Sequence, residues 1–346
     1  MTKITLVHRN SLSCEAIVRE VQNGDFLLVS QCDGLKEPAP ENRVYFWHSK
    51  DKGRTWGNRQ LLWPEDGRAV YQTEVSVIGN EITVFITLHN GFFFDWNCVI
   101  MKSHDNGYTW HEAGPPPVFD TFVFFRGLIQ TFDNTLILPY QRYPVTPELN
   151  RQLKDTGLPI HKHIQDIPYN ENGVLRSEDG GLSWKAFPAV TLLHEQRFHW
   201  GEPTVCELND HSLVMLLRVN HSGYLWRSDS KDGGKSWCDA YQTDIPNPNN
   251  KPKLLKLPNG DIALLNTPSA LSNPLARWSN ITDRHPLALW ISSDDMKTWR
   301  YKRDLITMPG AISYPDGFCS ADGKHIYLAI EFNRHDIYFI DHEIEE

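Results

Sequence analysis

The sequence predicts an all-β protein in which residues 1–346 form a single six-bladed β-propeller. Three observations lead to this fold class. An eight-residue phrase occurs five times along the chain, six hairpins of apolar strands accompany these copies, and strand-like segments at both ends of the chain are available to complete the last blade.

The repeated phrase has the pattern S-x-D-x-G-x-[ST]-W, and we call it the Asp-box. Its copies are SKDKGRTW, SHDNGYTW, SEDGGLSW, SKDGGKSW and SSDDMKTW, with aspartates at Asp51, Asp105, Asp179, Asp232 and Asp294. These aspartates lie 54, 74, 53 and 62 residues apart, which fits one four-stranded blade per copy. Each copy follows a strand-like segment, so it predicts a turn in which Asp accepts backbone hydrogen bonds and Gly takes a positive φ. Met296 replaces that Gly in the fifth copy, which predicts a slightly different turn there.

Six hairpins supply the inner strands of the blades. They read AIVREVQNGDFLLVSQ, EVSVIGNEITVFITLH, GLIQTFDNTLILPYQ, PTVCELNDHSLVMLLR, PKLLKLPNGDIALLNT and DGFCSADGKHIYLAIE. The sixth follows the last Asp-box, and we expect the C-terminal DIYFIDHEI and the N-terminal KITLVH to complete its blade. Closure by both termini would leave no exposed sheet edge.

Residues 148–170 are an insertion that explains the long third spacing, and we expect them to form a lid over the mouth of the central channel. The insertion contains His161 and His163. An HxH pair without nearby acids favours a lid over a metal site.

Composition excludes several kinds of partner. The net charge of -9 argues against nucleic acid and against an anionic membrane, because both require a basic surface. The N-terminal residues lack a signal-peptide pattern, so the chain as written is expected in the cytoplasm; a leader removed upstream would instead make it secreted or periplasmic. Six scattered cysteines predict buried free thiols rather than disulfides or zinc ligands.

Internal symmetry brings certain side chains together at the channel mouth. The first strand of each blade lines the channel, and aligning the hairpins on their turns gives a ring of Glu15, Tyr71, Phe125, Glu202, Lys251 and Tyr314. Two further rings on the same face contain His89 and Arg218, and Asp95 and Arg284.

Four of these residues suggest chemistry. A tyrosine beside a glutamate, as expected for Tyr314 and Glu202, can act as a nucleophile activated by a base. The guanidinium groups of Arg218 and Arg284 suit a planar carboxylate, which they can hold bidentately.

The Asp-boxes, WGEPTVCEL followed by VMLLRV, DRHPLALWISSDD and AISYPDGF together resemble the sialidase (neuraminidase) superfamily in its BNR-repeat branch. The resemblance covers essentially the whole chain and implies a retaining exo-glycosidase that cleaves a terminal sialic acid or other acidic sugar from a glycan or oligosaccharide. It implies that Tyr314 is the nucleophile, that Glu202 is its base partner, and that Arg218 and Arg284 hold the sugar carboxylate. It requires neither a metal nor an organic cofactor.

Two family features are missing. The family's first arginine lies in an F/Y-R-I-P phrase, whereas the matching stretch here is SLSCEAIV, with Glu15 where the proline would be. An acid at that place would repel a carboxylate, so Arg126 in FFRGL is the candidate for a third cation. The resemblance implies an aspartate as the acid/base, expected in the loop QCDGLKEPAPENR, which contains Asp33, Glu37 and Glu41; Asp95 on a neighbouring blade is a further candidate.

Two alternative functions remain open at this point. One is a relative with changed chemistry, a polysaccharide lyase or a rhamnosidase, in which His89 or Tyr314 acts as base; His89 on its own is more typical of a hydrogen-bonded channel histidine. The other is a non-catalytic glycan-binding propeller. Hydrolysis yields a reducing sugar, a lyase yields an ultraviolet-absorbing uronate, and a binding module yields neither.

Overall fold

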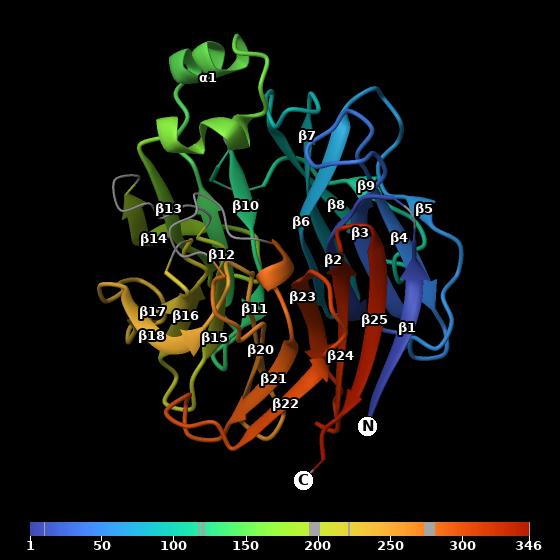
Figure 1. Cartoon of the computed structure of the whole chain (residues 1–346), viewed down its shortest axis with the longest axis vertical. Helices are drawn as coiled ribbons and strands as arrows, with labels where there is room; N and C mark the ends of the chain where they lie inside the picture. The colour runs from blue at the N-terminus through green and yellow to red at the C-terminus, as the bar shows by residue number, and fades with distance from the viewer. Residues whose placement is uncertain are drawn as a thin grey trace.

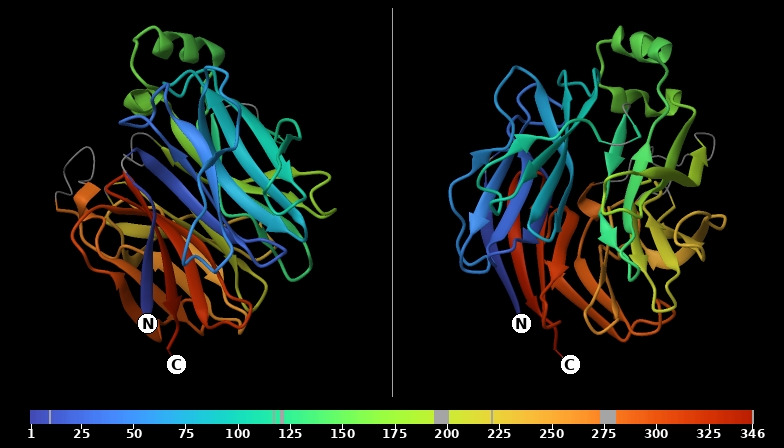
Figure 2. Two further views of the ribbon diagram at one scale, coloured as in Figure 1. Left: turned by 90° about the vertical axis from the view of Figure 1, so that its right-hand side faces the viewer. Right: turned by 180° about the vertical axis from the view of Figure 1, so that it is seen from behind.

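The structure, a computed structural model, describes residues 1–9, 11–116, 118–119, 122–193, 201–220, 222–272 and 281–345. Its strands form six antiparallel sheets around a common axis (Figures 1 and 2). The predicted all-β, six-bladed fold class is therefore confirmed.

Each blade runs from an inner strand beside the axis to an outer strand. Blade one contains β2 (Ser13–Glu20), β3 (Phe26–Cys32), β4 (Arg43–Ser49) and β5 (Gln60–Leu61), and blade two contains β6 (Ala69–Ile78), β7 (Glu81–His89), β8 (Asn97–Ser103) and β9 (His111–Glu112). Blade three contains β10 (Val123–Phe125), β12 (Leu136–Arg142), β13 (Tyr169–Ser177) and β14 (Lys185–Leu193), with β11 (Ile129–Gln130) also paired to β12. Blade four contains β15 (Pro203–Glu207), β16 (Leu213–Leu217), β17 (Tyr224–Ser230) and β18 (Tyr241–Pro246), and blade five contains β19 (Lys253–Lys256), β20 (Ile262–Asn266), β21 (Leu287–Ser292) and β22 (Tyr301–Ile306).

Both ends of the chain lie in blade six. Its order from the axis outward is β23 (Ile312–Cys319), β24 (His325–Phe332), β25 (Asp336–Glu343) and β1 (Thr2–His8). β1 pairs antiparallel with β25, with Ile4 opposite Ile340. The N-terminal strand thus occupies the outer edge of the last sheet, beside the C-terminal strand (Figure 1).

The core consists of apolar layers between adjacent blades, and strand alternation explains why the second strands are apolar throughout. Successive side chains of a strand point to opposite faces. In β16, Leu213 and Met215 pack toward blade three, whereas Val214 and Leu216 pack toward blade five. Each fully buried side chain of this kind contributes roughly 1.5–3 kcal/mol, so both faces of every blade stabilise the ring.

The Asp-boxes are the turns between the third and fourth strands of blades one to five. In the first, Asp51 accepts hydrogen bonds from the backbone N–H of Thr55 at 2.9 Å and from its hydroxyl at 2.7 Å. The expectation of a different fifth turn is wrong. Met296 itself adopts φ 66°, and its N–H donates to Ser292 Oγ at 2.9 Å, as the glycine of the first box does to Ser49.

The insertion forms the helix α1 (Pro147–Lys154) and the 3-10 helix η1 (Ile160–Asp166), which stand above one end of the channel (Figures 1 and 2). Thr146 caps α1 by accepting a hydrogen bond from the N–H of Leu149. Leu153, Ile160 and Ile164 pack on aromatic side chains of blades two and three, so the insertion is anchored to the propeller. No helix in the described part of the chain is long and apolar enough to cross a membrane.

Candidate functional site

Strained backbone aims three charged or phenolic side chains at the axis. Glu15 and Tyr314 lie in β-bulges of β2 and β23, and Glu202 immediately precedes β15. Their φ angles are 53°, 54° and 34°, in the left-handed region that non-glycine residues seldom adopt. Each such residue costs roughly 1–3 kcal/mol, and strain of this kind gathers at functional sites.

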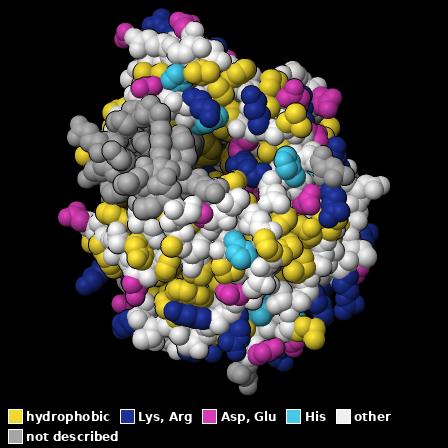
Figure 3. Space-filling model, viewed as in Figure 1, with side chains coloured by type: hydrophobic (Ala, Val, Ile, Leu, Met, Phe, Trp, Pro, Cys, Tyr) yellow, Lys and Arg dark blue, Asp and Glu magenta, His cyan; other side chains and the backbone are white. Residues whose placement is uncertain are grey.

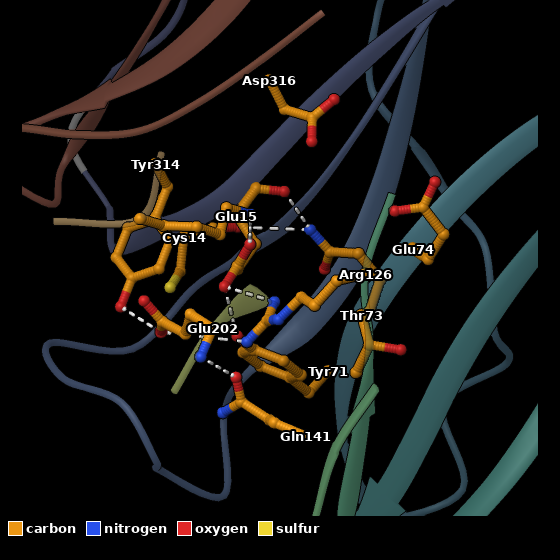
Figure 4. A network of polar contacts seen from close by, with 12 residues as sticks. Cys14, Glu15, Tyr71, Thr73, Glu74, Arg126, Gln141, Glu202, Tyr314 and Asp316 are labelled. Atoms are coloured by element: carbon orange, nitrogen blue, oxygen red, sulfur yellow. Dashed lines mark hydrogen bonds and ion pairs between the residues drawn. The ribbon is translucent and has the colours of Figure 1, made fainter. Parts of the chain in front are cut away.

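Tyr314, Glu202 and Arg218 form the centre of the site. The Tyr314 hydroxyl donates to Glu202 Oε1 at 3.1 Å, and Arg218 Nη1 donates to Glu202 Oε2 at 2.6 Å and to the Tyr314 hydroxyl oxygen at 3.1 Å. Figure 4 shows Tyr314 and Glu202 pointing toward each other. The backbone N–H of Glu202 also donates to Gln141 Oε1 at 2.7 Å, which fixes the base to blade three.

The charges of this centre follow from burial and from the neighbouring cations. Burial first, and then the Glu202 carboxylate, raise the pKa of Tyr314, so the resting phenol carries its proton. Burial alone would raise the pKa of Glu202, but Arg218, Arg126 and Lys251 together hold it below its usual value. The pair therefore consists of an ionised carboxylate facing a protonated phenol.

Glu15 does not present a free negative charge to a ligand. Its carboxylate is 1% exposed and accepts hydrogen bonds from Arg126 at 2.8 Å and from the Tyr71 hydroxyl at 3.0 Å, while Lys251 pairs with its other oxygen. Figure 4 shows Arg126 beside Glu15 and Tyr71. Two cations neutralise this carboxylate, so the repulsion expected from the sequence is offset.

Tyr314, Glu202 and Arg218 line a cavity of about 220 Å³ at the end of the channel below the insertion, whereas the predicted site residue Glu15 is not part of the lining. Its lining consists of Glu37, Tyr71, Phe93, Phe124, Arg126, His161, Glu202, Arg218, Arg284, Tyr314 and Arg334. Four guanidinium groups thus face two carboxylates, and this excess of positive charge favours an anionic ligand. Figure 3 shows a hollow in this face, with Lys or Arg and His side chains close to it.

Two arginines complete the cationic part of the lining. Arg284 Nη1 donates to Ser313 Oγ at 2.9 Å, and its guanidinium lies 5.5 Å from the centre of the Tyr314 ring. Arg334, from the turn between β24 and β25, pairs with Glu37 and donates to Cys14 Sγ at 3.2 Å. Glu37 comes from the β3–β4 loop, where the sequence analysis expected the acid/base residue.

The lining also contains three aromatic side chains and one histidine. The aromatic side chains are Tyr71, Phe93 and Phe124, and the insertion adds His161. Burial lowers the pKa of His161 to about 4, so this imidazole is neutral at physiological pH. His163 does not share the cavity lining and instead contacts Thr156 at 2.8 Å.

The structure places two of the predicted acid/base candidates outside the cavity. Asp33 accepts hydrogen bonds from Tyr45 at 2.6 Å and from Arg59 at 2.8 Å, outside the cavity. The carboxylate of Asp95 is 53% exposed and pairs with Lys154 at 2.8 Å. Both aspartates lie in loops, which do not repeat from blade to blade as the strands do. The alignment of the blades on their Asp-boxes therefore does not fix the direction of these two side chains.

His89 is also absent from the cavity lining. Its side chain is buried, and its Nδ1 accepts hydrogen bonds from the backbone N–H groups of Gly91 at 3.0 Å and Phe93 at 3.3 Å. Burial lowers its pKa to about 3. This imidazole supports the turn after β7, and the position gives no support to a histidine base.

Sequence reasoning missed Arg334, and its inner ring named Phe125 where Phe124 lines the cavity, although it did name Arg126. Phe124 and Arg126 face the cavity, whereas Phe125 packs in the layer between blades two and three. The ring that contains Arg218 was not continued into blade six. Counting seven residues from the turn at Gly323, as from His211 to Arg218, leads to Ile330, four residues before Arg334.

No metal site is evident in the part of the chain that the structure describes. There, no group of three or more His, Cys, Asp or Glu side chains is arranged to hold a metal ion. Four of the six cysteines are buried.

Solved structures similar to this chain share its fold at low sequence identity. A protein of unknown function from Dyadobacter fermentans is 16% identical with a TM-score of 0.73, and 99% of each chain is covered. A Hadza microbial sialidase is 16% identical with a TM-score of 0.71, covering 96% of this chain and 66% of that one. A Trypanosoma rangeli sialidase bound to 2,3-difluorosialic acid is 15% identical with a TM-score of 0.64, covering 98% of this chain and 58% of that one.

This chain therefore spans only about two thirds or less of these two sialidases. No curated protein matches it in sequence. A family model does match: it is described as a BNR repeat-like domain and covers residues 24–327, which is most of the chain. The expected kinship with BNR-repeat propellers is confirmed, and the chain belongs to the BNR repeat-like domain family.

Proposed function

We propose that this protein is a retaining exo-glycosidase that removes a terminal sialic acid or another acidic sugar from a glycan. One observation carries the proposal: a tyrosine hydroxyl lies 3.1 Å from a buried carboxylate, inside a cavity lined by four arginines. The fold similarity to two sialidases supports the same reading.

In the first step, Tyr314 Oη attacks the anomeric carbon while Glu202 takes the phenolic proton. The bond from the anomeric carbon to the leaving oxygen breaks, and Glu37 donates the proton that this oxygen needs. Transfer through Glu202 avoids a free phenolate, which burial makes costly. Arg218, 3.1 Å from the hydroxyl, stabilises the negative charge that develops on the oxygen.

In the second step, Glu37 removes a proton from water, and the water oxygen attacks the anomeric carbon of the glycosyl-tyrosine. The bond to Tyr314 breaks, and Glu202 returns the proton to the phenol. Two displacements at the same carbon give net retention of configuration.

The substrate carboxylate would bind at Arg218, Arg284 and Arg334, which all line the cavity. Arg334 would then exchange Glu37 for the carboxylate of the sugar. Glu37 would lose the cation that stabilises its ionised form and could carry the proton for the leaving oxygen. Only a sugar with an acidic group would prepare the acid in this way. Arg334, rather than Arg126, is the third cation that we assign to the carboxylate, because Arg126 already pairs with buried Glu15.

The test is release of the aryl group from an aryl α-sialoside by the wild type and by Tyr314→Phe. A matched control is Tyr301→Phe, which also removes one phenolic hydroxyl. The Tyr301 hydroxyl contacts His342 at 2.9 Å, and neither residue lines the cavity. Turnover lost in Tyr314→Phe and retained in Tyr301→Phe would support the nucleophile. Equal turnover in both variants would exclude it.

Trapping provides a direct readout of the covalent step. We expect 2,3-difluorosialic acid to add one sugar mass to the peptide that contains Tyr314. If the wild type does not hydrolyse sialosides, uronic-acid-capped and rhamnose-capped glycans come next. An ultraviolet-absorbing product would then indicate a lyase, and binding without turnover would indicate a binding module.

A further inference from the structure

A second cavity of about 430 Å³ adjoins the first. Its lining consists of Leu12, Leu35, Lys36, Glu37, Ile281, Thr282, Ala311, Asn333, Arg334 and His335. Glu37 and Arg334 are the residues that it shares with the cavity around Tyr314. The ion pair of Glu37 and Arg334 is therefore the wall between the two cavities.

Three segments build the second cavity around this wall. The β3–β4 loop supplies Leu35, the 3-10 helix η3 (Ile281–Asp283) supplies Ile281, and the β24–β25 turn supplies Asn333 and Arg334. Asn333 and Arg334 both have positive φ angles, 52° and 60°, so this tight turn holds the Arg334 backbone in a left-handed conformation beside the wall.

The chemistry of the lining suits a sugar ring. Leu12, Leu35, Ile281 and Ala311 provide aliphatic surface, and Leu35 is 90% exposed. Asn333 and His335 provide hydrogen-bonding groups of the kind that sugar hydroxyls use. Glu37 and Arg334 neutralise each other, so among the described residues Lys36 is the one charged group of this lining without a counter-ion within it. The excess of positive charge is therefore smaller than around Tyr314, and this favours a neutral ring over an acidic one.

We propose that the second cavity is the leaving-group subsite and binds the neutral pyranose to which the acidic sugar is attached. This inference rests on the proposed function of the first cavity. A glycan that spans both cavities must cross the wall, and its glycosidic oxygen then lies beside Glu37. This position supports the assignment of Glu37 as the acid, because among the described residues Glu37 is the one carboxylate that lines both cavities.

The experiment compares a large and a minimal leaving group. Wild type and Leu35→Asn are assayed on sialyl-lactose, whose leaving group is a sugar, and on sialyl fluoride, whose leaving group is a single atom. Leu182→Asn is the matched control, because Leu182 is 89% exposed and lies in the third Asp-box, outside both linings. Both leucines are exposed, so neither substitution should affect folding.

For Leu35→Asn we expect kcat/KM on sialyl-lactose to fall about five- to tenfold and kcat/KM on sialyl fluoride to stay within about twofold. Leu182→Asn should change neither value. An equal fall on both substrates, or no fall on sialyl-lactose, would overturn the subsite.

Calorimetry separates this inference from the proposed function. If no substrate is hydrolysed, the wild type and Leu35→Asn are titrated with free sialic acid and with sialyl-lactose. Tighter binding of sialyl-lactose than of sialic acid, lost in Leu35→Asn, would support the subsite while the proposed hydrolysis fails. Equal affinity for the two ligands, including no affinity for either, would overturn the subsite.

Discussion

Replacing Glu202 by Gln tests the centre of the site by two independent measurements. Gln is nearly isosteric and can still contact the Tyr314 hydroxyl and Arg218, but it cannot take the phenolic proton. Proton transfer by a positioned base contributes about 10²–10⁴-fold to rate. We therefore expect kcat of Glu202→Gln on an aryl α-sialoside to fall by about that factor, or roughly 3–5 kcal/mol in the barrier.

The same substitution should also destabilise the fold. Glu202 and Arg218 form an ion pair at 2.6 Å, with side chains only 4% and 7% exposed. Removing one partner of a buried pair costs about 3–5 kcal/mol, and the contacts that Gln keeps favour the lower value. With unfolding entropy near 2.1 cal/mol/K per residue, a loss of ~3 kcal/mol lowers Tm by about 4 °C for a chain of this length.

Glu207→Gln is the control for both measurements, because Glu207 lies on β15 and contacts exposed His211 at 3.3 Å. We expect it to leave kcat unchanged and to lower Tm by less than about 1 °C. The reasoning would be refuted if Glu202→Gln retained kcat within tenfold of wild type. It would also be refuted if both variants lowered Tm equally.

Three further predictions concern stability and are read by urea unfolding. Asp316→Asn should cost about 3–5 kcal/mol, because Asp316 pairs with buried Arg19 at 2.5 Å and with Lys253 at 3.1 Å inside the channel; a cost below about 1 kcal/mol would contradict this. Hydrogen bonds from Thr55 lower the pKa of Asp51 to about 2, so the contribution of Asp51 to stability is present above pH ~4 and lost as pH falls toward 2. Asp51→Asn should therefore reduce the loss of unfolding free energy between pH ~4 and pH ~2, and an unchanged loss would contradict this. Burial raises the pKa of Glu331 to about 7, so the stability linked to its protonated form is complete below pH ~4.5 and decreases as pH rises through 7. Glu331→Gln should therefore be more stable than wild type by about 3 kcal/mol at pH 8 and equal to it at pH 4; a difference that is the same at both pH values would contradict this.

The sequence was informative wherever one blade repeats another. Four cavity residues occupy positions that recur from blade to blade, and the shared strand geometry brings their side chains to one cavity: Glu202, Arg218, Arg284 and Tyr314. In β10 that geometry differs, so the predicted ring named Phe125, which packs in the core, although Arg126 beside it was predicted as a cation and does line the cavity.

Loops do not repeat from blade to blade, so the sequence predicts the direction of their side chains poorly. Asp95 follows β7 and Arg334 follows β24, and in neither place does an Asp-box or an alternating strand fix which way the side chain points. The pairing of Arg334 with Glu37 joins a turn of blade six to a loop of blade one, and such a contact follows from ring closure rather than from any local pattern. A pairing of that kind becomes visible only in three dimensions.

The pairing of β1 with β25 has a consequence for how the chain folds during synthesis. Of the strands of the propeller, β1 is synthesised first and its partner β25 last. β1 must therefore wait unpaired while five blades are completed, and the contacts with the largest sequence separation form last. Glu37 and Arg334 are nearly as far apart along the chain. The wall between the two cavities is thus completed only when the ring itself closes.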